Sequence, residues 1–177
     1  IPSPEFKVPR GLVIFAHGGG SSRRSYRNRY LAGRLRLAGW ATLRLDLLLE
    51  PEQLADAPEG AVRFDIALIT GRLHQATEWA TRETVPGSER IVLFGASTGA
   101  AAAAGVAAAL PASIAGLIGR GGRVDLAEAD LTRVRTPTLL VVGETDAETL
   151  ARTPGVVGRL AGPVTLRIVP GAGHTFE

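Results

Sequence analysis

The sequence contains no cysteine and no methionine, and Lys7 is the only lysine among its 177 residues. Without cysteine the chain has no disulfide framework and no thiol nucleophile, which is compatible with the cytoplasmic location that we expect. A membrane span needs an apolar run of about 18 residues or more, and no run approaches this length. We therefore expect no membrane segment.

Arginine supplies nearly all of the positive charge. The formal net charge is only +3, yet the isoelectric point is about 10.1 because arginine titrates at very high pH. Several arginines cluster between residues 23 and 36. A nucleic-acid surface would carry interleaved stacking aromatic residues and a stronger charge. We favour a solvated helix face for this cluster and expect no nucleic-acid partner.

Length and composition favour one domain. A chain of this size can bury a sizeable core, and 45% of its residues are hydrophobic. Residues 1–10 are interpreted as an added lead-in that takes no part in the fold. Residues 11–177 are expected to form a single domain without internal repeats or an interdomain linker.

Short apolar segments alternate with segments of helical character. The expected strands are residues 12–16, 40–45, 91–94, 114–118, 138–142 and 164–169. The expected helices are residues 25–38, 62–83, 100–110 and 147–161, whereas residues 47–60 are expected to form a loop. This alternation predicts an α/β fold, a doubly wound sheet of about six parallel strands in the order 2-1-3-4-5-6 with helices on both faces.

Residues that suit acyl-transfer chemistry follow the predicted strands. A parallel sheet places its functional site at the carboxyl ends of its strands. Five residues of interest come at such ends: His17, Ser97, Arg120, Asp146 and His174. Scattered surface residues would not be expected to line up in this way.

The pattern Gly-x-Ser-x-Gly occupies residues 95–99. It lies between a predicted strand and a predicted helix, which is the context of a nucleophile elbow. The turn must hold Ser97 in a strained backbone conformation, and only glycine fits at the two flanking positions. In a chain with 22 glycines the pattern can arise by chance, but its context favours the elbow.

A serine hydroxyl needs a base, usually an imidazole that a carboxylate orients. His174, in the loop after the last predicted strand, can reach Ser97 and is the candidate base; a solvated terminal histidine is the alternative. His17 is expected to brace the glycine loop that follows it. His74, within the long predicted helix, is interpreted as a surface or packing residue.

Three acidic residues are candidates for the carboxylate that orients the imidazole. Asp146 follows the fifth predicted strand and is the preferred candidate, Glu144 lies two residues nearer the strand, and Asp125 is a weaker rival. With Asp146 the chain order is serine, aspartate, histidine, the order found in α/β-hydrolases.

Stabilisation of an oxyanion requires two backbone donors. The N–H of Thr98, directly after the candidate nucleophile, is one. The second is expected from Gly19 or Gly18, because glycine lets the backbone approach a substrate closely. The Walker pattern for nucleotide phosphates is absent, and no set of residues has the spacing of metal ligands. We therefore expect no cofactor and no metal.

Several motifs together resemble the dienelactone hydrolase family of α/β-hydrolases, from residue 10 to residue 177. In particular, the chain is similar to small serine-bearing proteins of that group, some of which are fused to phosphoribosyltransferase domains. The resemblance implies an esterase or lactonase with a triad of Ser97, Asp146 and His174. The motifs that carry it are residues 15–18, residues 94–100, residues 142–143 leading to Asp146, and residues 173–174.

The chain departs from this family in two respects. The founding enzymes use cysteine where this chain has Ser97, so dienelactone itself is not the expected substrate. The family also normally continues into a closing helix, whereas this chain ends three residues after His174. We expect either a trimmed piece or a minimal version of the fold.

The leading functional hypothesis is a serine hydrolase that acts on an ester, thioester or lactone. The alternative is a non-catalytic domain of the same fold that binds a ligand or partner, since a fold alone cannot separate the two. The complete set of triad residues favours the enzyme. The sequence assigns no oligomeric state.

Arginines are expected to border the mouth of the site at two places. Arg23 and Arg24 follow the glycine loop, and Arg120 ends the fourth predicted strand. A guanidinium group at either place can pair with a carboxylate, so the predicted substrate is a small ester or lactone with an anionic group. The alternative is that these arginines pair with protein carboxylates such as Asp46 or Asp125.

Overall fold

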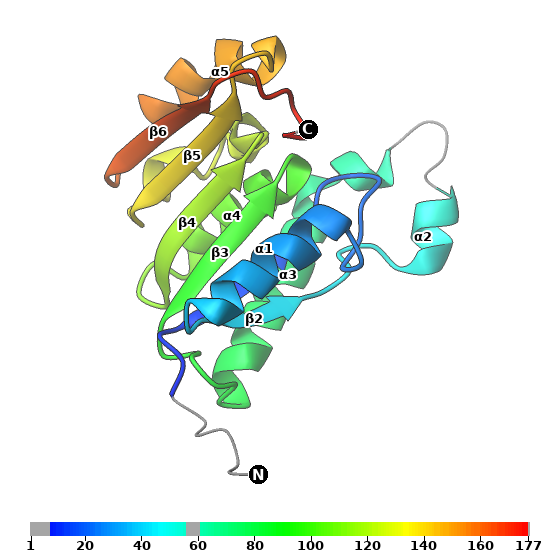
Figure 1. Cartoon of the computed structure of the whole chain (residues 1–177), viewed down its shortest axis with the longest axis vertical. Helices are drawn as coiled ribbons and strands as arrows, with labels where there is room; N and C mark the ends of the chain where they lie inside the picture. The colour runs from blue at the N-terminus through cyan, green and yellow to red at the C-terminus, as the bar shows by residue number, and fades with distance from the viewer. Residues whose placement is uncertain (1–7, 56–60, 177) are drawn as a thin grey trace.

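The computed structural model describes residues 8–55 and 61–176, which include a parallel sheet of six strands (Figure 1). The strands run in the order β2-β1-β3-β4-β5-β6, which confirms the predicted order. Residues 1–7 of the expected lead-in, residues 56–60 of the expected loop and residue 177 lie outside the described residues. The strands are β1 (Leu12–Ala16), β2 (Ala41–Arg44), β3 (Ile91–Ala96), β4 (Ile114–Arg120), β5 (Thr138–Gly143) and β6 (Val164–Val169).

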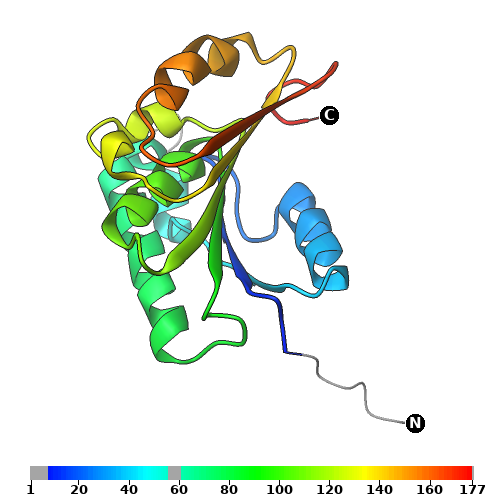
Figure 2. The same cartoon turned by 90° about the vertical axis from the view of Figure 1, so that its left-hand side faces the viewer.

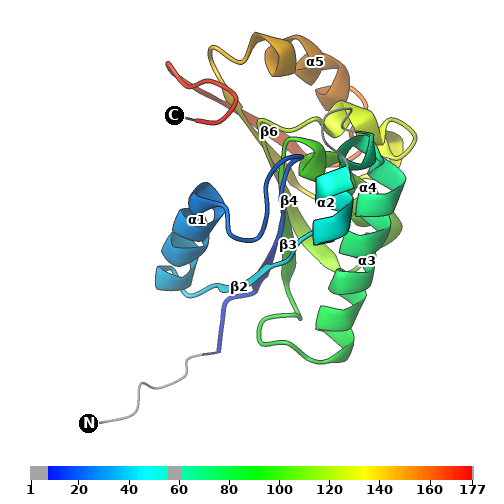
Figure 3. The ribbon, with the colours of Figure 1, turned by 90° about the vertical axis from the view of Figure 1, so that its right-hand side faces the viewer.

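Helices cover both faces of the sheet, as predicted, but unevenly. Figures 2 and 3 show α1 on one face and α3, α4 and α5 on the other. Within the described part of the chain, no helix is long and apolar enough to cross a membrane. The helices are α1 (Tyr26–Leu37), α2 (Glu50–Ala55), α3 (Ile66–Arg82), α4 (Thr98–Ala109) and α5 (Ala147–Val157), with 3-10 turns at Val62–Phe64, Val124–Ala127 and Leu131–Arg133.

Helix α4 lies in the middle of the larger core cluster. Every residue from 98 to 108 is buried, and most of them are alanine. Small side chains let α4 approach α3 closely: a Cβ at Gly105 would lie 2.8 Å from Cγ2 of Thr70. The alanine-rich sequence of α4 therefore produces a helix that is packed on all sides over residues 98–108, and this helix begins at the residue after Ser97.

On the opposite face a smaller cluster packs beneath α1. Phe15 of β1 and Phe94 of β3 have ring centroids 5.0 Å apart, and Leu31 and Leu35 of α1 pack against this cluster. Only α1 covers this face in the described residues, and Ile168 of β6 is 51% exposed.

The structure corrects two of the predicted helix boundaries. The helix expected from residue 62 begins at Ile66, because the side chain of Asp65 accepts the N–H of Leu68 at 2.9 Å and caps the helix there. The helix expected to reach residue 161 ends at Val157, and Gly158 is its C-cap.

A short helix, α2, lies within the segment that was expected to be a loop. Pro51 is the second residue of α2, a position where a missing backbone N–H is tolerated. The side chain of Glu52 accepts the N–H of Leu49 at 2.7 Å, which satisfies a donor just before the helix. Pro51 is therefore compatible with a short helix in this segment.

Candidate active site

Ser97 has a strained backbone conformation at the turn between β3 and α4. Its φ is 49° and its ψ is −124°, a combination that an L-residue with a side chain rarely adopts. The neighbouring strand holds this turn in place: the N–H of Ser97 donates to the carbonyl of Arg120 at 3.3 Å, and the carbonyl of Ser97 accepts the N–H of Arg123 at 3.0 Å. The predicted strand–turn–helix context is confirmed.

The two glycines that flank Ser97 have no room for a side chain. A Cβ at Gly95 would lie 2.3 Å from Cα of Ala100, and a Cβ at Gly99 would lie 2.3 Å from the carbonyl oxygen of Ala16. These contacts are with backbone atoms, which cannot rotate away. Both glycines are thus required for the close packing of β1, β3 and α4 around the turn.

Asp146 and His174 are in direct contact. Nδ1 of His174 lies 2.7 Å from Oδ2 of Asp146. Asp146 is only 7% exposed, and its side chain also accepts the N–H of Thr149 at 3.3 Å. Burial opposes ionisation of Asp146, but the hydrogen bonds from His174 and Thr149 outweigh it, so its pKa lies below the usual value. An ionised carboxylate only accepts hydrogen bonds, so Nδ1 carries the proton and Nε2 is left as a base.

The two rival carboxylates have other partners. Oε2 of Glu144 accepts the N–H of Gly171 at 2.8 Å, so Glu144 braces the loop that carries His174. Asp125 binds Arg123 through two oxygen atoms, with distances of 3.0 and 2.9 Å. Of the three candidates from the sequence, only Asp146 contacts the imidazole.

His174 lies at the same edge of the sheet as Ser97. A Cβ at Gly121 would lie 3.4 Å from Nδ1 of His174, and Gly121 follows Arg120, whose carbonyl binds the N–H of Ser97. No hydrogen bond joins Ser97 Oγ to His174 within residues 8–55 and 61–176. Hydrogen bonds of this kind are often long without substrate. The structure thus joins two of the three predicted triad residues directly and brings the third to the same edge.

The glycine loop after β1 lies against the elbow. A Cβ at Gly18 would be 2.8 Å from Cβ of Ser97, so glycine is required there. The N–H of Gly19 donates to the side-chain hydroxyl of Thr98 at 3.0 Å. The sequence argument used only the backbone N–H of Thr98. The role of its hydroxyl was missed, and a threonine at the buried first position of α4 was the only signal for it.

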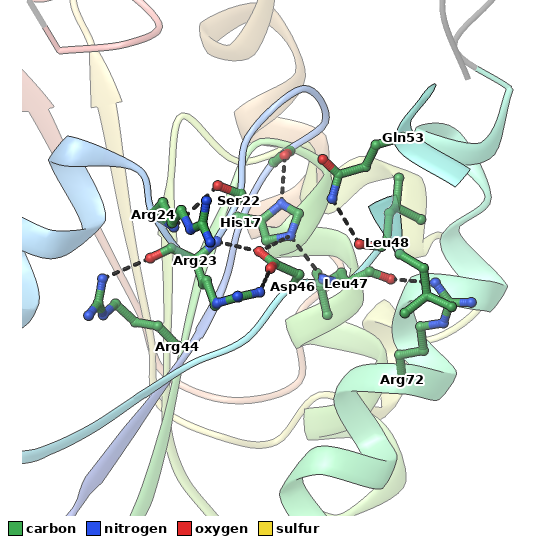
Figure 4. Close-up of polar contacts among 12 residues, drawn as sticks. His17, Ser22, Arg23, Arg24, Arg44, Asp46, Leu47, Leu48, Gln53 and Arg72 are labelled. Atoms are coloured by element: carbon green, nitrogen blue, oxygen red, sulfur yellow. Dashed lines mark hydrogen bonds and ion pairs between the residues drawn. The ribbon is translucent and has the colours of Figure 1, made fainter. Parts of the chain in front are cut away.

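His17 holds this loop in place through hydrogen bonds, as predicted (Figure 4). Its Nδ1 donates to the carbonyl of Gly18 at 2.9 Å, and its Nε2 accepts the N–H of Leu47 at 2.9 Å. Because Nε2 must stay unprotonated to accept, the ring is neutral. Burial lowers its pKa despite the opposing effects of the Gly18 carbonyl and the Asp46 charge. His74, the third histidine, is a helix-surface residue whose Nδ1 lies 3.6 Å from Glu78.

Arg23 pairs with a protein carboxylate, which was the alternative considered for it. Figure 4 shows its guanidinium group bound to Asp46, and Asp46 also accepts the backbone N–H of Arg23 at 2.5 Å. Arg44 in turn donates to the carbonyl of Arg23 at 2.7 Å. These bonds connect the start of the α1 segment to the end of β2 and occupy the guanidinium group that was predicted to bind substrate.

Arg120 lies between two aromatic rings. Its guanidinium carbon is 5.7 Å from the ring centroid of Phe94 and 6.0 Å from that of Phe176, and it lines an apolar cavity of about 550 Å³ between α1 and the sheet. Burial and the positive charge of Arg27 lower its pKa, and its buried Nε has no hydrogen-bond partner in the described residues. The contribution of Phe176 was not foreseen, since no sequence pattern marks it.

Comparison with known proteins gives a consistent picture of the fold. No model of a known protein family matches the chain. The crystal structure of a dienelactone hydrolase from Anabaena variabilis is 44% identical, with a TM-score of 0.89 over 96% of this chain and 78% of that one. Est1E from Butyrivibrio proteoclasticus, solved with ferulic acid bound, is 15% identical with a TM-score of 0.78, covers 97% of this chain and 84% of that one, and supports the fold alone.

Among curated proteins, two from strains of Mycobacterium tuberculosis are 44% identical over 169 residues, which is 96% of this chain. Both are provisionally named as phosphoribosyl transferases. This chain spans only 37% of their length.

Proposed function

Since this chain belongs to the dienelactone hydrolase family, we propose that it is a serine hydrolase that cleaves an ester, thioester or lactone through an acyl-enzyme on Ser97. The observation that carries this proposal is the 2.7 Å contact between Asp146 and His174 at the sheet edge where the strained Ser97 turn lies. Strained backbone of this kind clusters at active sites, and here it lies at the same sheet edge as a histidine that a buried aspartate orients.

In the proposed first step, Ser97 Oγ attacks the carbonyl carbon and Nε2 of His174 takes the hydroxyl proton. Asp146 stabilises the resulting imidazolium. His174 then gives this proton to the departing alcohol or thiol, and the acyl group stays on Ser97. A water molecule next loses a proton to His174 and attacks the acyl carbon, and the proton returns to Ser97 Oγ as the acid leaves.

The tetrahedral intermediates place negative charge on the former carbonyl oxygen. We propose that the N–H groups of Thr98 and Gly18 stabilise it, because the N–H of Gly19 already donates to the hydroxyl of Thr98. The contact between Gly18 and Cβ of Ser97 supports this assignment, as does the anchoring of the loop by His17 and Thr98. Donors held in advance in this way need no reorganisation during the reaction.

A fluorophosphonate probe followed by a panel of short-chain esters tests the proposal. Wild-type protein should be labelled on one serine, and Ser97→Ala should be neither labelled nor active. Ser113→Ala is a suitable control, because this serine lies in the turn before β4 at the opposite edge of the sheet. A well-folded protein that neither reacts with the probe nor turns over any ester would instead support a ligand-binding domain.

A further inference from the structure

The loop that carries His174 ends in a turn that Phe176 closes. The N–H of Phe176 donates to the carbonyl of Gly173 at 3.2 Å, so His174 and Thr175 are the two central residues of a β-turn. Phe176 itself has a φ of 61°, a backbone conformation that bulky residues rarely adopt. Strain of this kind persists only where surrounding contacts hold it, and it clusters at functional sites.

Two residues at the end of β4 lie against this turn. A Cβ at Gly121 would be 2.9 Å from the carbonyl oxygen of His174 and 3.5 Å from Cε1 of its ring, so His174 lies directly on bare backbone there. The residue before Gly121 is Arg120, whose guanidinium carbon is 6.0 Å from the ring centroid of Phe176. The turn is thus in contact with the backbone of one residue and the side chain of the other.

Arg120 also contacts the segment that carries the nucleophile. Its carbonyl accepts the N–H of Ser97 at 3.3 Å, and its guanidinium carbon lies 5.7 Å from the ring centroid of Phe94 in β3. Arg120 therefore connects the turn of Ser97 to the turn of His174. In the part of the chain that the structure describes, no hydrogen bond joins Ser97 Oγ to His174, so their approach depends on how these two turns are held.

The two aromatic rings are the favourable partners of this buried cation. Burial and the positive charge of Arg27 both lower the pKa of Arg120, and no carboxylate of the described residues opposes this decrease. Its buried Nε has no hydrogen-bond partner within residues 8–55 and 61–176. A buried charge without a carboxylate partner is costly, and the faces of aromatic rings offset part of this cost. Moving Phe176 away from Arg120 would remove one of the two rings.

We propose that Arg120 and Phe176 are positioning residues of the hydrolase: the guanidinium group, held between two rings, fixes the turn of residues 173–176 so that Nε2 of His174 can reach Ser97 Oγ. The sequence suggested a different role for Arg120, which was to bind an anionic group of the substrate. Both residues would act only through the location of the imidazole. This inference rests on the proposed hydrolase function.

Variants of Phe176 test the aromatic contact. Phe176→Leu keeps an apolar side chain but removes the ring, whereas Phe176→Tyr keeps the ring. We expect Phe176→Leu to lower kcat about tenfold to a hundredfold with little change in KM, because a misplacement of about 1 Å can cost this much. Phe176→Tyr should retain most of the wild-type kcat. Equal kcat in the three proteins would overturn the inference.

Variants of arginine separate positioning from substrate binding. Arg120→Met keeps a stem of similar length without the charge, and Arg36→Met, at an exposed position near the end of α1, is the matched control. The acetyl esters of 3-hydroxypropanoate and of 2-methoxyethanol supply an anionic and a neutral substrate of similar length. Arg120→Met should lower kcat by about tenfold or more on both esters, and the control should keep the wild-type values. A rise of KM for the anionic ester alone would assign Arg120 to substrate binding and overturn the inference.

The state of the imidazole can be followed without any substrate. At pH 8, the ¹⁵N chemical shifts of His174, assigned with His174→Gln, report which ring nitrogen carries the proton. Wild-type protein and Phe176→Tyr should have the proton on Nδ1, next to Asp146, whereas Phe176→Leu and Arg120→Met should show a mixture of both tautomers. A mixture in the wild-type protein, or an unchanged tautomer in both impaired variants, would contradict the positioning role.

These shifts also separate the inference from the proposed function. If the wild-type protein fails to react with a fluorophosphonate, the hydrolase proposal fails, and the shifts still report whether Phe176 and Arg120 hold His174. If the serine reacts but Phe176→Leu changes neither kcat nor the tautomer, the positioning assignment alone is wrong.

Discussion

The N–H of Gly19 donates a 3.0 Å hydrogen bond to the hydroxyl of Thr98, the residue directly after Ser97. This bond ties the loop after β1 to the first turn of α4. The two segments are 79 positions apart in the chain, and together they supply the proposed oxyanion donors. The buried side chain of Thr98 therefore helps, together with the hydrogen bonds of His17, to fix their relative position.

Replacing Thr98 by valine keeps the shape of the side chain but removes the acceptor. We expect kcat to fall about tenfold to a hundredfold with little change in KM, because a misaligned donor loses part of the 10²–10³ that a complete oxyanion donor supplies. Thr98→Ser should retain most of the activity. Steady-state kinetics on one ester measures all three proteins, and an increase of kcat in Thr98→Val would mean that Thr98 competes with the oxyanion instead of positioning its donor.

The strain at Ser97 predicts a difference between two inactive variants. Both Ser97→Ala and Ser97→Gly should lose hydrolysis by about 10³-fold or more. Glycine relieves about 1–3 kcal/mol of strain at this φ and ψ and costs about 0.5–1 kcal/mol in chain entropy. Ser97→Gly should thus unfold with a free energy about 1 kcal/mol higher than Ser97→Ala. Chemical denaturation measures the difference, and a less stable glycine variant would argue against the strained turn.

The choice of Asp146 over its rivals is open to a direct kinetic comparison. Asp146→Asn should lower kcat by about 10³-fold or more, because the amide no longer favours the tautomer with the proton on Nδ1 of His174. Glu144→Gln and Asp125→Asn are matched controls, since their side chains bind Gly171 and Arg123 instead. The assignment of Asp146 is wrong if Glu144→Gln is the more damaging change.

Burial of neutral His17 predicts a pH dependence of stability. Its pKa is lowered in the folded state, so the unfolded chain binds the proton first as the pH falls. The free energy of unfolding should therefore decrease below about pH 6.5, by up to about 1.4 kcal/mol per pH unit, until the folded-state pKa is reached. His17→Gln should be less stable at pH 8 but should lose this decrease, whereas His74→Gln should keep it. Denaturation curves between pH 5 and 8 provide the measurement; an unchanged slope in His17→Gln would refute the assignment.

Two glycine-to-alanine replacements should have opposite effects on stability. A Cβ at Gly99 meets the carbonyl oxygen of Ala16 at 2.3 Å, whereas a Cβ at Gly33 of α1 meets nothing within 4 Å. Gly99→Ala should cost about 3 kcal/mol or more because backbone must move. Gly33→Ala should add about 0.5–1 kcal/mol through helix propensity. Thermal or chemical unfolding of both variants checks the pair, and a tolerated Gly99→Ala would mean that the elbow is packed less tightly.

The order of the sheet was predictable because each strand is a short apolar run and parallel crossovers leave few alternatives. The bounds of β1 and β6 agree with the expected ranges. The start of α3 was predicted too early, because Val62 fits the apolar spacing of the helix that follows. The side chain of Asp65 caps the helix, which therefore begins at Ile66. A cap of this kind acts through one hydrogen bond, which periodicity does not reveal.

Within the candidate site, the sequence indicated the strand ends but could not determine which side chains meet there. Glu144 and Asp146 are two residues apart, and their different partners depend on how the loop after β6 folds back over β5. The pairing of Arg23 with Asp46 likewise joins segments that are distant in the chain. Contacts of this range follow from tertiary packing and have no local sequence signature.

The burial of every residue from 98 to 108 in α4 bears on how such an enzyme can diverge. Residues 98–108 offer no surface on which substitutions could accumulate without disturbing the core. The loops after β1 and β6, by contrast, carry exposed side chains next to the reacting serine. New substrate preferences can therefore evolve through these loops while the location of Ser97 is inherited unchanged.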